Sequence, residues 1–210
     1  MNVLVIPEDF RRDQYVLRPL IRSMMACLGQ RRAHVDVCRD PLLGGIAQAL
    51  RIENLQLIVK ANPMVDLFLL CVDRDGEEGR RTILSNVEMR LRNQIKKAGG
   101  AFLAENAWQE IEVWLLAGHE LLKGWRWNEI RAHRDPKETY YVVLARQRNV
   151  ADDDSQGRKV LGLEAAGRYQ RIRQLCREDI LVLEKRVGAW LTDNAHVSWD
   201  EAYKEIQAAE

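Results

Sequence analysis

Apolar runs of strand length alternate with helical stretches along the first part of the chain. Four runs are short and apolar or alternating: residues 2–6, 33–37, 65–72 and 101–104. Four stretches repeat apolar side chains at helical spacing: residues 12–28, 46–61, 82–97 and 108–117. Strands that alternate with helices pair in parallel through right-handed crossovers. The pattern therefore predicts an α/β fold, a three-layer sandwich around a mainly parallel four-stranded sheet, in which 65–72 is a central strand.

The pattern changes beyond about residue 122. Four segments are helical in spacing: residues 128–132, 137–148, 163–176 and 179–191. No strand pattern accompanies them, and the polar run at 150–157 predicts a mobile loop. We therefore expect an α/β domain over residues 1–122 and a helical extension over residues 123–210, packed on it as one structural unit.

Composition and charge exclude several classes of protein. The 210 residues are 47% hydrophobic and 30% charged, which is too apolar for a disordered chain. The net charge of +1 lacks the basic excess of many nucleic-acid-binding proteins. No apolar run reaches the ~18–20 residues that span a bilayer, and the N-terminus lacks signal-peptide features, so we expect a cytoplasmic protein without a membrane partner. The four cysteines form no CxxC pair, which predicts buried reduced thiols and no zinc site.

Carboxylates follow two of the predicted strands. Glu8 follows the first strand, and Asp73 and Asp75 follow the third. Ligands of parallel sheets bind at the carboxyl ends of the strands, so these side chains converge if the two strands are neighbours. Clustered carboxylates repel one another unless a cation such as Mg²⁺ neutralises them. The alternative is that the segment DRDGEEG is a polar turn in which Asp75 or Glu77 caps the next helix.

This arrangement of acids resembles a known signature. A glutamate after the first strand and a DxD pair after a later central strand resemble the Toprim signature of topoisomerases, primases and OLD-family nucleases. The segments QYVLRPL, VDLFLLCVDRDG and QEIEVWLLAG, together with Arg158–Lys159, further resemble an uncharacterised Toprim-like family of bacterial proteins, often encoded beside ATPases in mobile or defence loci. The likeness covers about residues 1–192. It implies a Toprim fold and phosphodiester chemistry that depends on one or two Mg²⁺ (or Mn²⁺) ions.

The resemblance also implies roles for individual residues. Glu8 would act as general acid/base or as a metal ligand, and Asp73 and Asp75 would hold the metal. Lys159 lies where the family suggests a functional, catalytic lysine. Each of these assignments follows from the resemblance and from the matching position in this sequence.

The chain also offers candidates for a further metal ligand. Glu112, in the predicted helix after the fourth strand, is the best candidate, and Glu110 is weaker because residues two apart on a helix face differently. A surface or structural acid is the alternative for Glu112. Where the family has an aspartate after the LLA run, this chain has Gly118 and His119. Because of this departure, it stays open whether this region binds metal as a third acidic motif.

Cationic side chains suggest contacts with phosphate. Arg80 and Arg81 open the predicted helix after the DxD pair, where a cation opposes the helix dipole, which favours a role in phosphate or nucleic-acid contact. The alternative is solvation or pairing with Glu77 or Glu78. Eight scattered arginines form either a backbone-binding track or ordinary solvated faces: Arg11, Arg12, Arg31, Arg32, Arg90, Arg92, Arg131 and Arg134.

Two functions from different classes follow. The first is a Mg²⁺-dependent nuclease or related phosphoryl-transfer enzyme acting on DNA or RNA, in the anti-phage defence or mobile-element setting that the resemblance implies. The second is a non-catalytic Toprim-like subunit that docks on a partner ATPase and regulates it. A phosphatase of the HAD type also uses a DxD pair, but there the pair follows the first strand, whereas here it follows the third.

Overall fold

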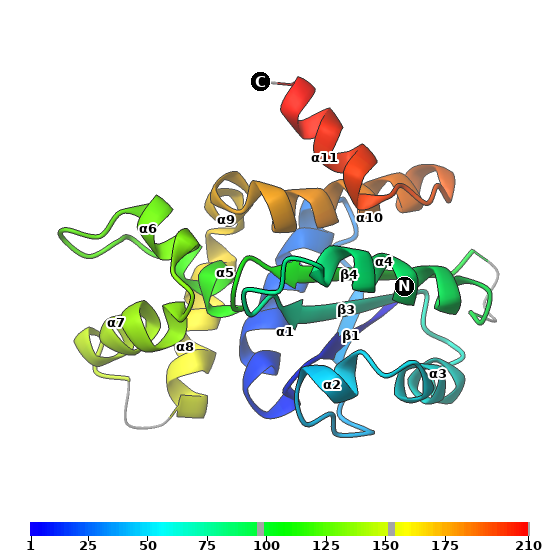
Figure 1. The fold of residues 1–210 in the computed structure, drawn as a ribbon, viewed down its shortest axis with the longest axis horizontal. Coiled ribbons are helices and arrows are strands. Elements are labelled where there is room, and N and C mark those ends of the chain that lie inside the picture. Colours follow the sequence, from blue (N-terminus) through cyan, green and yellow to red (C-terminus); the bar gives the residue numbers. More distant parts are fainter. Residues whose placement is uncertain (96–98, 151–153, 210) are drawn as a thin grey trace.

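The computed structural model describes residues 1–95, 99–150 and 154–209. Four strands lie in these residues: β1 Asn2–Pro7, β2 His34–Val37, β3 Leu67–Asp73 and β4 Ala101–Ala107. They form one sheet in the order β2-β1-β3-β4, and all three pairings are parallel. The α/β class, the parallel four-stranded sheet and the central position of β3 are thereby confirmed (Figure 1).

Helices surround this sheet and continue beyond it. The helices of the first part are α1 Phe10–Cys27, α2 Ile46–Ala49, α3 Ile52–Ala61, α4 Arg80–Arg92 and α5 Glu112–Ala117. The later helices are α6 Trp127–Ala132, η1 Lys137–Tyr141, α7 Val142–Gln147, α8 Asp154–Gly167, α9 Tyr169–Leu175, η2 Arg177–Leu181, α10 Val182–Asp193 and α11 Trp199–Ala208, where η1 and η2 are π-helical. Each helix in the described residues is too short or too polar to cross a membrane.

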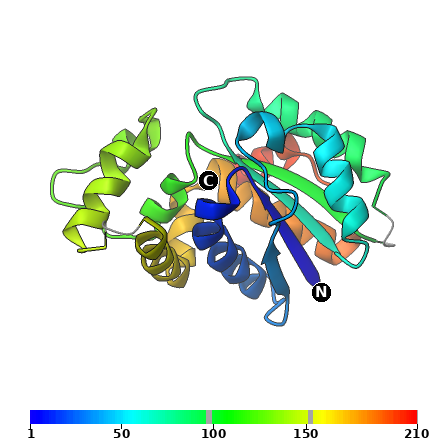
Figure 2. The same ribbon diagram turned by 90° about the horizontal axis from the view of Figure 1, so that it is seen from below.

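Both faces of the sheet are buried, which explains the continuous apolar runs of its strands. Val5, Leu69 and Leu103 point to one face and pack with α1, α5, α8, α9 and α10. Leu70 and Phe102 point to the other face and pack with α2, α3 and α4. Alternate residues of one strand thus enter two cores, as the pleat requires. The sandwich has three layers, and the C-terminal extension contributes to one of the two outer layers (Figures 1 and 2).

Several element boundaries differ from the sequence predictions. The predicted helix 46–61 is two helices, because Arg51 adopts an extended conformation (φ −72°, ψ 117°) between α2 and α3. The predicted helix 108–117 begins only at Glu112, because β4 extends to Ala107 and the next residues turn back toward β3. The predicted helix 82–97 is α4, which ends at Arg92, and residues 96–98 lie outside the described part.

The polar run at 150–157 is also different from the prediction. Residues 151–153 lie outside the described residues, but Asp154–Gly167 is helix α8, so the C-terminal part of the run is not a loop. Close packing of α8 against α1 outweighs the low helix preference of the polar run. Helix α11 was not predicted. It follows the last predicted helix and begins with a capping box formed by Ser198 and Glu201.

The contact between α8 and α1 depends on a glycine. A Cβ placed on Gly162 would lie 2.3 Å from the carbonyl oxygen of Tyr15, so only glycine permits this approach. We expect Gly162→Ala to lower the free energy of unfolding by about 2 kcal/mol, because backbone must move apart to accept the methyl group. Urea denaturation measures this change.

Gly167, at the end of the same helix, is the matched control for Gly162. A Cβ there meets no atom of the described residues within 4 Å. Gly167→Ala should leave stability unchanged or raise it by up to about 1 kcal/mol, through lower entropy of the unfolded chain and higher helix propensity. Equal stabilities for the two variants would show that α8 moves away from α1 at no cost.

Candidate functional site

Two of the predicted acids meet at the carboxyl edge of the sheet. β1 and β3 are adjacent, with Pro7 opposite Cys71, so the residues that follow each strand emerge side by side. Glu8 Oε2 accepts a hydrogen bond of 3.4 Å from the backbone N–H of Asp73. The adjacency of the two strands, on which the predicted convergence depended, is present, and Glu8 and Asp73 line one pocket.

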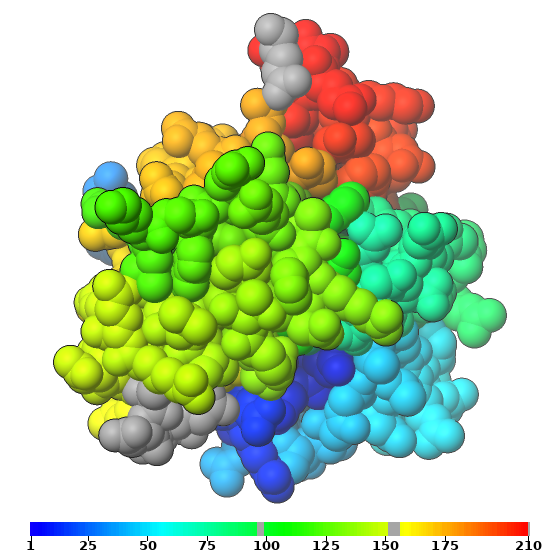
Figure 3. Space-filling view, turned by 60° about the vertical axis from the view of Figure 1, so that its left-hand side comes forward, coloured from blue at the N-terminus to red at the C-terminus, as the bar shows by residue number. Residues whose placement is uncertain are grey.

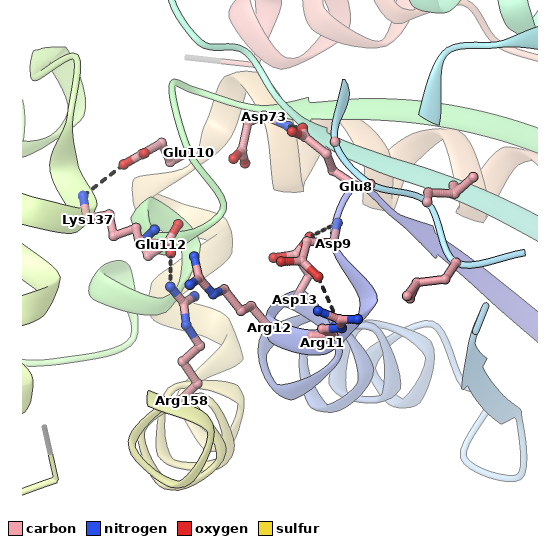
Figure 4. Close-up of a pocket in the computed structure, with 14 residues that line it drawn as sticks. Glu8, Asp9, Arg11, Arg12, Asp13, Asp73, Glu110, Glu112, Lys137 and Arg158 are labelled. Atoms are coloured by element: carbon pink, nitrogen blue, oxygen red, sulfur yellow. Dashed lines mark hydrogen bonds and ion pairs between the residues drawn. The ribbon is translucent and has the colours of Figure 1, made fainter. Parts of the chain in front are cut away.

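The pocket has a volume of about 480 Å³ and draws its walls from several elements. In Figure 4, Glu8 and Asp73 lie on one side, and Glu110 and Glu112 lie across from them at the start of α5. Asp13 enters from the first turns of α1. Figure 3 shows the blue N-terminal surface between the yellow-green η1–α7 region and cyan α2–α3. Asp9 lines the pocket as well, so six carboxylates share one concave space.

Backbone amides orient some of these carboxylates. Ile111 N–H donates to Asp73 Oδ1 at 2.8 Å, which ties the end of β3 to the turn before α5. Lys137 N–H donates to Glu110 Oε2 at 2.8 Å. Asp13 Oδ2 accepts from the N–H of Asp9 at 2.8 Å. Each hydrogen bond favours the charged form of the carboxylate and fixes its direction.

The electrostatic balance nevertheless disfavours full ionisation. Burial raises the pKa of Asp73 well above its ordinary value, and the charges of Glu112, Glu8 and Asp13 raise it further. Burial likewise raises the pKa of Asp13 to about 7 and that of Glu110 to about 7. Burial also raises the pKa of Glu8. The pocket concentrates more negative charge than its own cations neutralise, as expected of a site that binds a cation.

One arginine lies deep among these acids. Arg158, from α8, is 1% exposed and forms an ion pair with Glu112, which is 5% exposed. Its guanidinium also lies 4.8 Å from the ring centre of Tyr141. Two further cations line the same pocket, Arg12 of α1 and Lys137 of η1 (Figure 4). The pocket therefore combines carboxylates with fixed positive charge, the two components that metal-assisted phosphate chemistry uses.

The second aspartate of the DxD pair is placed differently from the first. Asp75 is exposed, has a left-handed backbone (φ 54°) and is not among the residues that line the pocket. Its N–H donates to Gln109 O at 3.1 Å, within the turn. Its charge still raises the pKa of Glu8, so it lies near the site. Asp75 does not cap α4, whose preceding Gly79 N–H is bound by Glu77.

The two predicted phosphate contacts have different surroundings. Arg80 is nearly buried, and its Nε has no hydrogen-bond acceptor within the described part of the chain. Its charge acts on both Glu8 and Asp75. Arg81 instead forms an ion pair with buried Glu105 and stacks on Trp199, 3.8 Å from the ring centre. Arg81 thus anchors α11, and its guanidinium is turned to protein partners and not to the pocket.

The predicted catalytic lysine lies outside the pocket. Lys159 is exposed on α8 and does not line the pocket, whereas its neighbour Arg158 does. Adjacent residues of a helix point about 100° apart, so only one of them faces the acids. Sequence reasoning also missed Asp13 and Lys137. Asp9 closely follows the first strand, and Asp13 lies one helical turn after it. This spacing was the signal in the sequence that could have placed Asp13 near the pocket.

The ion pair between Glu112 and Arg158 should couple the effects of these two residues on the free energy of unfolding. Glu112→Gln removes the charge that compensates Arg158, so we expect the metal-free protein to lose about 3 kcal/mol of unfolding free energy. Arg158→Gln should cost a similar amount. The double variant should be more stable than the sum of the two losses indicates, with a coupling energy of about 1–3 kcal/mol in urea melts. Strict additivity would show that the pair contributes no coupling.

The chemistry of the donors fits a hard divalent cation. Carboxylate oxygens are the preferred ligands of Mg²⁺ and Mn²⁺. Among the residues that the structure describes, no three acidic, histidine or cysteine side chains are grouped so that they could hold a metal ion. Mg²⁺ keeps several waters and commonly takes one or two carboxylates from the protein. Glu8 and Asp73 satisfy that smaller requirement.

No protein-family model, no curated protein and no solved structure matches this chain. The geometry of the pocket therefore carries the functional argument.

Proposed function

We propose that this protein is a Mg²⁺-dependent (or Mn²⁺-dependent) nuclease that cleaves phosphodiester bonds in DNA or RNA. The observation that carries the proposal is the pairing of Glu8 and Asp73 at the carboxyl ends of adjacent parallel strands, in a pocket that also holds Arg158. Carboxylates supply ligands for the cation, and a fixed guanidinium stabilises charge on a phosphoryl group. The resemblance to Toprim proteins supports the same chemistry.

The position of each residue in the pocket suggests its role. Glu8 and Asp73 would hold the ion, which when bound polarises a phosphoryl oxygen and lowers the pKa of a coordinated water. Arg158 and Arg12 would bind the non-bridging oxygens of the phosphate and orient it toward the acids. Arg80, with a buried Nε free to donate among the described residues, would add positive charge near Glu8.

The test is a cleavage assay joined to a metal-binding measurement. Purified protein is incubated with plasmid, single-stranded DNA and transfer RNA, with Mg²⁺, Mn²⁺ or EDTA. Melting curves are recorded with the same ions. A specific ion at 100 times its dissociation constant should add about 2.7 kcal/mol to the unfolding free energy. Cleavage that requires the metal, together with this stabilisation, is the expected result.

Two other outcomes are informative. Metal-dependent stabilisation without cleavage would support a nuclease that awaits a partner, such as the ATPase that the resemblance implies in a defence locus. Absence of both cleavage and stabilisation would contradict the nuclease and favour the second function, a subunit that docks on an ATPase and regulates it. A pull-down assay with a partner ATPase of the kind that the resemblance implies then becomes the direct measurement.

A further inference from the structure

Positive charge is concentrated in one segment of the chain. Residues 10–39 contain seven arginines and two aspartates, a net charge of +5. The whole chain has 32 basic and 31 acidic residues, so the rest carries 25 basic and 29 acidic residues, a net charge of −4. A nearly neutral protein thus has a strongly basic segment, and charge segregated in this way attracts a polyanion locally.

The basic segment forms one edge of the molecule. It comprises α1, the turn that follows it and β2, the edge strand of the sheet. In Figure 2 these elements lie side by side at the lower edge, and an ion pair of 2.7 Å between Arg18 and Asp36 joins α1 to β2. The surface is therefore continuous, although its residues come from two elements.

The arginines of α1 form a row that begins at the acidic pocket. Arg11, Arg18 and Arg22 are seven and four residues apart, which places them on one face of the helix. The row extends about 16 Å along the helix axis. Arg11 lines the pocket of the candidate site. Arg18 and Arg22 line a second hollow of about 240 Å³ together with His34 of β2.

Three arginines of the basic segment are available to a ligand. Arg22, Arg31 and Arg32 are exposed, and within the described residues no carboxylate forms an ion pair with them. Guanidinium groups match phosphate oxygens in geometry and charge, and they remain charged at all physiological pH values. The row, the turn and the pocket mouth together offer several phosphate contacts in sequence.

We propose that this basic surface, defined by Arg11, Arg18, Arg22, Arg31 and Arg32, binds the phosphate backbone of single-stranded nucleic acid and leads the strand into the acidic pocket. The inference rests on the proposed nuclease function. The pocket, at about 480 Å³, has the size of a small-ligand site. A nucleotide enters such a pocket from a single strand or after leaving a duplex. Continuity between the row and the pocket therefore favours a single strand over an acidic protein.

The test measures binding without cleavage. Fluorescence anisotropy of labelled 20-nucleotide single-stranded DNA and RNA, and of a duplex of the same sequence, is recorded in EDTA at several salt concentrations. The triple variant Arg22→Gln/Arg31→Gln/Arg32→Gln removes three exposed cations from the surface. Its affinity for single strands should fall on the order of 10²-fold near 0.1 M salt, and its log–log salt slope should decrease by about 2.

A matched control removes equal charge from another face. Lys60→Gln/Arg90→Gln/Arg92→Gln lies on α3 and α4, across the sheet from α1, and these residues are also exposed. It should bind nearly as tightly as wild type. The triple arginine-to-lysine variant at positions 22, 31 and 32 should keep most of the affinity, because the charges remain. Melting curves verify that all three variants are folded.

The outcomes separate the inference from the proposed function. Equal losses for the two glutamine variants, tighter binding of the duplex, or no binding of single strands at low salt would each overturn the basic surface as a single-strand site. Metal-dependent cleavage that does not change when these arginines are replaced would support the nuclease and refute only the role of the basic surface. Arginine-dependent binding with neither cleavage nor metal-dependent stabilisation would support the basic surface and count against the nuclease. DNA and RNA arms identify the preferred strand.

Discussion

Asp73→Asn is expected to reduce metal-dependent cleavage strongly while making the metal-free protein more stable. The substitution keeps an oxygen that accepts from Ile111 N–H but removes the charge that would hold the cation. Activity should fall on the order of 10³-fold. Because burial and neighbouring acids raise the pKa of Asp73, its ionised form opposes folding near neutral pH, and asparagine relieves that cost. Cleavage rates and melting curves in EDTA measure the two effects.

Asp75→Asn is the matched control, because it makes the same change two residues away. Asp75 is exposed in the turn and does not line the pocket, so its loss should reduce activity far less and change stability little. The original DxD hypothesis gives both aspartates equal weight as metal ligands. Equal losses of activity in the two variants would therefore show that the turn rearranges to bring Asp75 to the ion, contrary to the geometry described above.

Asp179→Ala should be among the most destabilising substitutions in the chain, at about 3–5 kcal/mol. Asp179 is fully buried in η2 and forms an ion pair with Arg131. Its carboxylate also accepts hydrogen bonds from Trp108 N–H at 3.0 Å and Trp114 Nε1–H at 2.8 Å. Alanine would leave the two tryptophan N–H donors unsatisfied, and buried Arg131 would keep Glu178 as its ion-pair partner but lose Asp179. Urea denaturation at pH 7 measures the loss, with exposed Asp193→Ala as the control within about 0.5 kcal/mol.

The effect of Asp179 should depend on pH in a definite direction. Burial alone would raise its pKa, but Arg131 and the hydrogen bonds hold that pKa below the ordinary value of 3.8. An aspartate with a depressed pKa stabilises the fold above pH 3.8, and this contribution is lost as the pH falls through the folded-state pKa. The stability gap between wild type and Asp179→Ala should therefore narrow in acid below pH 3.8. A gap that is constant down to pH 2 would contradict this assignment.

This buried network also supports the candidate site. Trp108 and Trp114 flank the turn whose Ile111 N–H binds Asp73, and Asp179 holds both tryptophans. The helical extension thus braces the turn that orients an acid of the sheet. Asp179→Ala should disturb activity as well as stability, because a small displacement of a positioned group reduces catalysis. The extension and the α/β part act as a single mechanical support for the pocket.

The sequence by itself determined the class of fold and the sheet edge where the candidate site lies. Alternating apolar runs predicted the parallel sheet, because strands buried on both faces must be apolar throughout. The positions of Glu8 and Asp73 after strands one and three predicted their edge, because parallel strands end together. Such inferences depend on periodicity and chain order, which are local properties of the sequence.

Tertiary structure decided which residues share the pocket. Arg158 is 46 residues from Glu112 in sequence, and only the packing of α8 on α1 brings its guanidinium to that acid, while Lys159 points elsewhere. Asp13 has the pattern of an ordinary helix acid, and only the packing of α1 on the sheet brings it to the pocket. The burial of Glu105 in β4 likewise depends on a distant partner, Arg81. The turn that delays the start of α5 depends on another, Asp73. Long-range contacts of this kind leave no periodic trace in the chain, because they depend on how helices pack and not on spacing along one element.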